Sequence, residues 1–470
     1  MPSGPSGGAD VVVVGAGLAG LSAALAAREG GARVILLEKM GAPGGSTVTS
    51  GGSFAFGGTA EQRALGIADS PARLREDLAR VGGGVADPVL QDLYVALQLE
   101  THDWLKRQGV QFHKVSLSSN TSVPRTHPTR PRQVIDALVE RLVSAGANLR
   151  TGAATVRLLS GHDPAAVAGV ALKDGEEIEA GAVVLASGGF ARNPDMVRRY
   201  APSLAGAHAW GGAGNTGDGI EMGLSLGAGL ADMAYVAGTF GVALARYPDT
   251  EPRPGDEVLL RMAMYRGAIA VNLEGRRFAD ESLSYKTLGT ACLAQPRGIA
   301  FQVFDQPVMA QSAPAPNLND FQDALAKGAI RSAGSIEDLA CAVGLDPGRL
   351  AATVARYNRD LEQGVPDEFG RRTLGGGVGK PVPLRTPPFY ILPCCTALLA
   401  TYCGLKVDAQ MRVRTTEDRP VPGLYAAGET VGGFHGAGYM SGSALGKAAI
   451  FGRVAGAQAA RFALGQRNSH

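Results

Sequence analysis

Apolar and polar positions at the start of the chain follow an ordered pattern. Residues 11–14 are an unbroken run of valine, which predicts a buried parallel strand. An Ala/Leu-rich segment that runs to about Gly30 predicts a helix, and residues 33–37 predict a second strand that ends at Glu38. Strand, helix and strand in this order predict a nucleotide-binding βαβ unit.

The turn between the first strand and the helix carries a GxGxxG pattern. In order, its residues are Gly15, Ala16, Gly17, Leu18, Ala19 and Gly20. The first glycine permits a tight turn, the second lets backbone approach a pyrophosphate, and the third lets helix and strand pack closely. Glu38 is placed to accept a hydrogen bond from a ribose hydroxyl. At this point the cofactor is either NAD(P) or FAD.

Composition and charge exclude several classes of protein. Glycine supplies 66 of 470 residues, about twice the average share, yet the hydrophobic fraction of 45% is ordinary, which excludes a collagen or a disordered chain. The net charge of +2 without a basic cluster gives no support for nucleic-acid binding. Five cysteines without a CxxC pair favour a reducing cytoplasm, and we predict neither a metal site nor a membrane span.

Further glycine and hydroxyl segments follow in a fixed order along almost the whole chain. They are Gly44-Gly45-Ser46-Thr47, Ser50-Gly51-Gly52, Ser187-Gly188-Gly189, Asn215-Thr216-Gly217-Asp218-Gly219, Gly428-Glu429 and Gly442-Ser443-Ala444-Leu445. Together they resemble the flavoprotein subunit family of succinate dehydrogenase and fumarate reductase. The resemblance implies FAD, and it implies noncovalent binding because Gly45 stands where covalent members carry a histidine.

The resemblance also assigns the residues that hold FAD. Beyond the GxGxxG turn, the implied cofactor residues are Glu38, Lys39, Gly44, Gly45, Ser46, Thr47, Ser50, Gly51, Gly52, Ala154, Ser187, Gly188, Asn215, Asp218, Gly428, Glu429, Ser443, Ala444 and Leu445. The backbone amides of Ala444 and Leu445 are expected to face the pyrimidine edge of the flavin. They stand at the start of a predicted helix over residues 446–463, whose positive end stabilises negative charge there.

The order of the motifs implies an α/β fold with an inserted domain. Residues 1–237 and 375–470 are expected to form one Rossmann-like FAD domain of the glutathione reductase type. Residues 238–374, with a strand signal at 268–272 and a helix signal at 350–362, are expected to form an α+β capping domain over the flavin. Residues 156–172 fit a small β-meander inside the FAD domain.

The arginines that clamp dicarboxylates in fumarate reductases are missing from this chain. Tyr285 occupies the place of the proton-donating arginine, and Tyr439 that of the substrate-clamping arginine. The place of a carboxylate-binding histidine falls on Ala400. Phenols donate single neutral hydrogen bonds, whereas guanidinium groups are suited to carboxylates.

This exchange is similar to the 3-ketosteroid Δ1-dehydrogenases and cyclic-ketone desaturases of the same superfamily. That similarity implies Tyr285 as the base that removes an α-proton, with Tyr439 and the Gly442 amide on the carbonyl oxygen. Tyr402 joins the candidate catalytic residues, and Lys286 or Arg266 is the candidate cation that lowers the pKa of Tyr285. The expected substrate is a cyclic ketone, such as a cyclohexanone derivative or a 3-ketosteroid, with a quinone, dye, oxygen or electron-transfer protein as acceptor.

Three alternatives stay open. The segment 401–407 and the run GAGYMSG look more like tricarballylate dehydrogenases, which desaturate a polycarboxylate, and an enoate reductase of fumarate type would run the reaction in reverse. A third is an assembly flavoprotein without independent turnover.

Several other residues have structural interpretations at this stage. His435 is read as support for the flavin or its loop, and Trp104 as a core residue of an amphipathic helix over 90–108. The group Arg125, His127, Arg130 and Arg132 is read as a solvated loop rather than an anion site.

Overall fold

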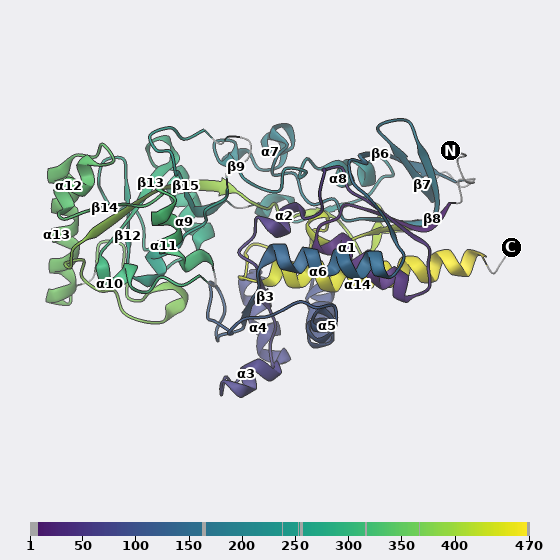
Figure 1. Cartoon of the computed structure of the whole chain (residues 1–470), viewed down its shortest axis with the longest axis horizontal. Coiled ribbons are helices and arrows are strands. Elements are labelled where there is room, and N and C mark those ends of the chain that lie inside the picture. The colour runs from purple at the N-terminus through teal and green to yellow at the C-terminus, as the bar shows by residue number, and fades with distance from the viewer. Residues whose placement is uncertain are drawn as a thin grey trace.

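The computed structural model describes residues 8–161, 166–236, 238–251, 253, 257–314, 317–365 and 367–467. Two parts lie side by side along the long axis of the molecule (Figure 1). One is built on an eight-stranded sheet and the other on a six-stranded sheet.

The eight-stranded sheet is parallel at its centre. Its main path is β17-β18-β8-β1-β2-β5, and β6 and β7 form a meander with β8. The strands are β1 (Ala9–Val14), β2 (Val34–Leu37), β5 (Asn148–Arg150), β6 (Thr155–Ser160), β7 (Val167–Leu172), β8 (Glu177–Leu185), β17 (Arg412–Arg414) and β18 (Pro420–Ala426). Strand β1 pairs in parallel with β2 and β8, and all its residues are buried. The predicted Rossmann-like α/β fold and the predicted meander are therefore confirmed.

Helices cover this sheet and extend beyond it. Helices α1 and α14 pack against each other and against the sheet, and α6 packs on α1 (Figure 1). The helices of this part are α1 (Leu18–Glu29), α2 (Gly45–Val48), α3 (Ala60–Ala64), α4 (Pro71–Val81), α5 (Pro88–Arg107), α6 (Pro131–Ser144), α7 (Pro194–Tyr200), α8 (Asp218–Leu224) and α14 (Ser443–Arg467). Two short ladders, β3 (Ser53–Ala55) with β4 (Thr126–Pro128) and β10 (Leu230–Ala231) with β16 (Gly404–Leu405), complete it.

The six-stranded sheet forms the second part. Its order is β11-β15-β13-β12, and β14 and β9 also pair with β15. Its strands are β9 (His208–Ala209), β11 (Thr239–Ala243), β12 (Ile269–Asn272), β13 (Ile299–Phe304), β14 (Arg331–Ala333) and β15 (Phe389–Leu398). Its helices are α9 (Tyr285–Leu293), α10 (Gln306–Met309), α11 (Phe321–Ala326), α12 (Ile336–Cys341) and α13 (Pro347–Gln363). The strand and helix predicted at 268–272 and 350–362 are present as β12 and α13.

Alternation along the strands gives this second sheet two separate apolar cores. On β13, Ala300 and Phe304 belong to one core, and Phe301 and Val303 belong to the other. Tyr285 packs into the first core, and Tyr439, from a loop of the larger part, packs against the same core.

The predicted domain boundaries stay predictions. The second sheet takes β9 from before residue 238 and β15 from after residue 374, so strands on both sides of the predicted insertion complete it. Residue 237 lies outside the described residues.

Candidate active site

One cavity of about 450 Å³ runs from the β1–α1 turn to the junction of the two parts. Most of the predicted cofactor residues line it: Gly15, Gly17, Leu18, Ala19, Glu38, Lys39, Gly45, Ser46, Thr47, Ser50, Gly51, Gly52, Ser187, Gly188, Asn215, Asp218, Gly428, Glu429, Ala444 and Leu445. The remaining ones are adjacent to lining residues but do not line it themselves: Ala16, Gly20, Gly44, Ala154 and Ser443. The cavity thus brings together segments from both ends of the chain.

The three glycines of the β1–α1 turn differ in what surrounds them. A Cβ at Gly15 would lie 2.5 Å from the Ala186 carbonyl oxygen, and one at Gly20 would lie 1.7 Å from the Gly15 carbonyl oxygen. These two glycines permit close packing of helix on strand. A Cβ at Gly17 would meet nothing nearer than 3.8 Å, so this residue presents open backbone to the cavity. The surroundings match the requirements of a pyrophosphate at the N-terminus of α1.

Two acids lie at separate points along the cavity, Glu38 buried and Glu429 partly buried. Glu38 accepts hydrogen bonds from the backbone amides of Ala16 and Met40, both at 2.8 Å. Glu429 accepts from the Thr401 amide at 2.9 Å and from Asn215 Nδ2 at 3.1 Å, and burial raises its pKa. Donors of the protein fix the orientation of each carboxylate. A fixed carboxylate is suited to accept a further hydrogen bond from a ribose hydroxyl.

The N-terminus of α14 faces the far end of the cavity. Ala444 and Leu445, in the first turn of this 25-residue helix, line the cavity, as does Lys447. Lys447 Nζ donates to the Val431 carbonyl oxygen at 2.5 Å, and burial lowers its pKa to about 8. A helix N-terminus attracts negative charge. The open glycines, the two acids and this helix end together fit a long dinucleotide such as FAD.

Three tyrosines meet at the same end of the cavity. Tyr285 begins α9 of the second part, whereas Tyr402 and Tyr439 come from loops of the larger part. The rings of Tyr402 and Tyr439 are stacked with centroids 4.7 Å apart, and the Tyr285 ring lies 6.3 Å from that of Tyr439. The Tyr285 hydroxyl lies 3.3 Å from Ser441 Oγ, and the Gly442 amide donates to the Tyr439 hydroxyl at 3.3 Å. Ser441 was not among the residues predicted from the sequence, although it lies two residues after Tyr439.

Lys286 supplies a buried amine beside these rings. Its Nζ donates to Thr239 Oγ1 at 2.7 Å and lies 4.6 Å from the centroid of the Tyr402 ring. Burial lowers its pKa to about 7, against an opposing effect of Glu429. Arg266, the other candidate cation, lies in a 3₁₀ turn and does not line the cavity. Of the two candidates, Lys286 is the cation that lies beside the tyrosines.

Burial controls the protonation of the aromatic groups at this end. It raises the pKa of Tyr285 and of Tyr402 well above the ordinary value, and Tyr439 shifts in the same direction. It lowers the pKa of His435 well below the ordinary value, and Lys447 and Lys286 add to this effect. The three phenols and this imidazole are therefore neutral at pH 7. Lys286 does not overcome the burial of Tyr285, so the expected lowering of the Tyr285 pKa is absent.

One arginine lines the cavity within the part of the chain that the structure describes. Arg132 is the only arginine among the described lining residues, and its Nη1 donates to the Pro43 carbonyl oxygen. The tyrosine end thus offers neutral phenols and two amines, those of Lys286 and Lys447, rather than a guanidinium fork.

The interpretation of Arg125 and His127 as a solvated loop is wrong. Arg125 is fully buried and pairs with Asp69 at 2.8 Å and Asp77 at 2.9 Å, and His127 is also fully buried. Neither residue lines the cavity. Trp104 lies in the core as expected, with 2% of its surface exposed.

Comparison with known proteins identifies the family. The family described as "FAD binding domain" matches residues 10–445. The chain belongs to the FAD-binding flavoproteins of the succinate dehydrogenase and fumarate reductase superfamily. A fumarate reductase (cytochrome) of Shewanella frigidimarina is 31% identical, over 98% of this chain and 79% of that protein. The predicted FAD cofactor and oxidoreductase activity on CH–CH bonds are thereby confirmed.

Two solved structures resemble the flavoprotein along nearly its whole length. The open conformation of a flavocytochrome c3 fumarate reductase superposes with a TM-score of 0.84 at 29% identity, over 98% of this chain and 79% of that one. The 3-ketosteroid-Δ4-(5α)-dehydrogenase of Rhodococcus jostii superposes with a TM-score of 0.73 at 26% identity, over 96% of both chains. The flavoprotein is thus similar both to a fumarate reductase and to a ketosteroid dehydrogenase. Within the described residues, no helix has the length and apolar character needed to cross a membrane.

Proposed function

We propose that the flavoprotein desaturates a ketone at its α,β-carbons, with a cyclic ketone such as a cyclohexanone derivative or a 3-ketosteroid as substrate. The observation that carries this proposal is the meeting of three neutral tyrosines at the end of the cavity where the described lining residues include no arginine. A neutral carbonyl oxygen requires hydrogen-bond donors, whereas a dicarboxylate requires compensating positive charge.

Tyr439 is the proposed donor to the carbonyl oxygen. The Gly442 amide donates to the Tyr439 oxygen at 3.3 Å, so the Tyr439 hydroxyl proton is directed elsewhere. Donation from Tyr439 to a ketone oxygen would make the α-carbon more acidic. When bound, FAD supplies the acceptor for the hydride that leaves the β-carbon.

Tyr285 is the proposed group that exchanges a proton with the α-carbon. Because burial raises its pKa, Tyr285 must lose its own proton as it takes one from the substrate. The Ser441 hydroxyl, 3.3 Å from the Tyr285 hydroxyl, is the nearest route for that proton. In the reverse direction the neutral phenol would donate its proton directly, so the same geometry also supports reduction of an enone.

An anaerobic screen tests the substrate class. Oxidised holoenzyme is mixed with cyclohexanone-type ketones, 3-ketosteroids, tricarballylate and succinate, and bleaching of the flavin absorbance is followed. We expect bleaching by a ketone and none by the two polycarboxylates. Failure of every ketone, together with reoxidation of the reduced enzyme by fumarate, would instead support the enoate reductase. Bleaching by tricarballylate alone would support the polycarboxylate dehydrogenase.

The Tyr285→Phe variant tests the proton-transfer role. It should retain FAD and slow single-turnover flavin reduction by about 10²-fold, which is typical of the loss of a general acid or base. Tyr390→Phe is the matched control, since Tyr390 donates to Gln306 in the second part and does not line the cavity. An unchanged rate in Tyr285→Phe would remove Tyr285 from the mechanism.

A further inference from the structure

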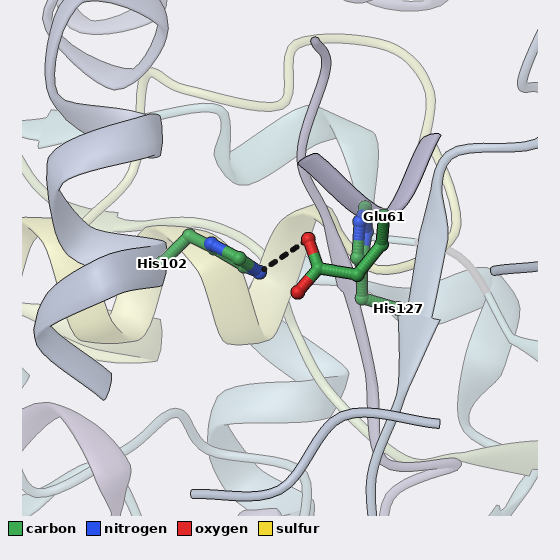
Figure 2. A group of neighbouring side chains, drawn as sticks. All are labelled: Glu61, His102 and His127. Carbon is green, nitrogen blue, oxygen red and sulfur yellow. Dashed lines mark ion pairs between the residues drawn. The ribbon is translucent and has the colours of Figure 1, made fainter. Parts of the chain in front are cut away.

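Outside the cavity, three residues with metal-ligating side chains converge. Glu61 lies on α3, His102 on α5 and His127 on β4, and one ligand atom from each lies within 4.8 Å of the others. Figure 2 shows the His102 ring pointing at the Glu61 carboxylate, with His127 beside them. His102 is 2% exposed and His127 is fully buried. No metal site was predicted from the sequence, because the separations of 41 and 25 residues between the three side chains match no short metal-binding motif.

Hydrogen bonds determine which nitrogen of His127 carries the lone pair. Its Nδ1 lies 2.8 Å from the Arg125 carbonyl oxygen. A carbonyl can only accept, so Nδ1 carries the hydrogen and Nε2 carries the lone pair. Burial lowers the pKa of His127 to about 4, which keeps the ring neutral at pH 7. Nε2 lies 2.9 Å from Thr59 Oγ1, whose proton has a second acceptor in Gln62 Oε1 at 3.4 Å.

The same reasoning applies to His102. Its Nδ1 lies 3.1 Å from a carboxylate oxygen of Asp103, which directs the Nδ1 hydrogen there. The Nε2 lone pair then points at Glu61 Oε2 from 3.5 Å (Figure 2). Both atoms are buried, and neither has a hydrogen-bond partner among the described residues. The contact between His102 Nδ1 and Asp103 is of the kind that orients a metal-binding histidine, because it leaves the other ring nitrogen free to bind the metal.

Glu61 pairs with Lys106 through one carboxylate oxygen and has the other oxygen available. Lys106 Nζ lies 2.8 Å from Oε1, which leaves Oε2 to face the histidines. A lone pair and an anionic oxygen that face each other without a proton between them repel, and a cation between them removes that repulsion.

We propose that Glu61, His102 and His127 bind one divalent transition-metal ion, with Zn²⁺ preferred. Two imidazole nitrogens and one carboxylate oxygen form a common protein ligand set for Zn²⁺, with a fourth position open to water. Ligands at about 2.0–2.1 Å in tetrahedral geometry lie about 3.3 Å apart, close to the 3.5 Å between His102 Nε2 and Glu61 Oε2. The ligand atoms lie within 4.8 Å of one another, whereas a tetrahedral site requires about 3.3 Å. Binding of the ion therefore requires His127 to move by about 1 Å toward the other two ligands.

The ion would join three elements behind the cavity wall. His127 pairs with Phe54 across the β3–β4 ladder, and Ser53 at the start of β3 lines the cavity. The Ala55 amide donates to the Gly442 carbonyl oxygen at 3.1 Å, so β3 also contacts the loop that carries Tyr439. The metal would therefore hold α3, α5 and β4 together and stabilise the fold without touching the substrate.

Metal titration of the holoenzyme tests the proposal. The purified flavoprotein is freed of metal with a chelator and then titrated with Zn²⁺ or Co²⁺, with metal content, Co²⁺ absorption and thermal midpoint as readouts. We expect one equivalent per chain, four-coordinate Co²⁺ bands, and a thermal midpoint that rises with Zn²⁺ concentration. Protonated His102 paired with Glu61 is the alternative, and it predicts no stoichiometric binding and no Co²⁺ bands.

Matched variants locate the ion. Glu61→Gln keeps the shape of a partly exposed side chain and should weaken Zn²⁺ binding at least 10-fold. Glu76→Gln, at an exposed position of α4, and His113→Gln, at a histidine outside the cluster, should bind Zn²⁺ like the unchanged protein. Equal affinity in all four proteins would overturn the assignment. If Glu61→Gln does not fold, the Co²⁺ spectrum of the unchanged protein still decides whether histidine nitrogens bind the metal.

Discussion

At the scale of single residues, burial is the main influence on the chemistry of the candidate site. Tyr285, Tyr402 and Tyr439 are kept as neutral phenols, and Lys286 is brought to a pKa of about 7. Burial among three aromatic rings disfavours the charged form of Lys286, so about half of its amine is neutral at pH 7. The three phenols therefore present neutral hydrogen-bonding groups, which suit a ketone oxygen.

Lys286 should make stability depend on pH in a defined direction. Its pKa is about 7 in the folded protein and near 10.4 in an unfolded chain, so between these values the unfolded state binds more protons. The contribution of Lys286 to the free energy of unfolding therefore rises with pH, by about 2 kcal/mol between pH 7 and pH 9. Lys286→Met should lack this increase.

Urea unfolding of the unchanged protein and of Lys286→Met, at several values of pH from 6.5 to 9.5, measures the effect. The difference between the two proteins is the relevant quantity, because the similar contribution of Lys447, with a pKa of about 8, is present in both. A difference that stays constant across this range would show that Lys286 has an ordinary pKa.

At the scale of elements, two helices far apart in the sequence meet through glycine. A Cβ at Gly452 of α14 would lie 2.4 Å from the Ala19 carbonyl oxygen of α1, and one at Gly456 would lie 2.0 Å from the Ala23 carbonyl oxygen. The two glycines are four residues apart and so lie on one face of α14. They let α14 approach the backbone of α1, the helix whose N-terminus faces the cavity.

Gly456→Ala should therefore destabilise the protein. The added methyl group forces α1 and α14 apart, which costs about 1–3 kcal/mol, as overpacking does elsewhere. FAD content should also fall, since Gly17 and Ala19 at the start of α1 line the cavity. The thermal midpoint and the ratio of flavin to protein measure both effects.

Gly465→Ala is the matched control on the same helix. A Cβ at Gly465 would meet no atom within 4 Å, and the residue is exposed. Alanine is a better helix former than glycine, so this variant should be more stable by about 0.5–1 kcal/mol. Shifts of the same sign in the two variants would contradict the packing argument.

Elements that follow from local rules could be predicted from the sequence, and contacts between distant elements could not. The GxGxxG turn and strand β1 follow from backbone requirements and from a buried run of valine, both of which are local. Arg125 was misplaced because the proline-broken loop around it has the composition of a surface segment. Its partners Asp69 and Asp77 lie about 50 residues away, and only the fold brings them to it.

The tyrosine site shows the same division. Tyr285 and Tyr439 could be located because they stand at positions of a family motif. The contact between their rings could not be predicted from the sequence, because 154 residues separate them. The protonation of these groups could not be predicted, because it depends on burial from both parts of the molecule. For that reason the expected lowering of the Tyr285 pKa did not appear.

At the scale of the whole molecule, the candidate site exists only where the two parts meet. Thr239, Leu260, Tyr285 and Leu318 come from the part with the six-stranded sheet, and Tyr402, Tyr439 and Ser441 come from the part with the eight-stranded sheet. The second part connects to the first through neighbouring strands β9, β11 and β15 of one sheet. A ligand at the tyrosines would therefore contact both parts at once.

Ligand binding should then stabilise the whole molecule, and the chemistry of the ligand should decide by how much. A cyclic ketone that binds the folded state at 100 times its Kd adds about 2.7 kcal/mol, which raises the thermal midpoint by several degrees. Succinate at the same concentration should produce little shift, because the tyrosine end has no arginine among its described lining residues. Tyr285→Phe and Tyr439→Phe alter opposite sides of the junction, and each should reduce the shift by ketone. If succinate raises the thermal midpoint more than every ketone does, the site accepts carboxylates. That result would contradict the proposed substrate class.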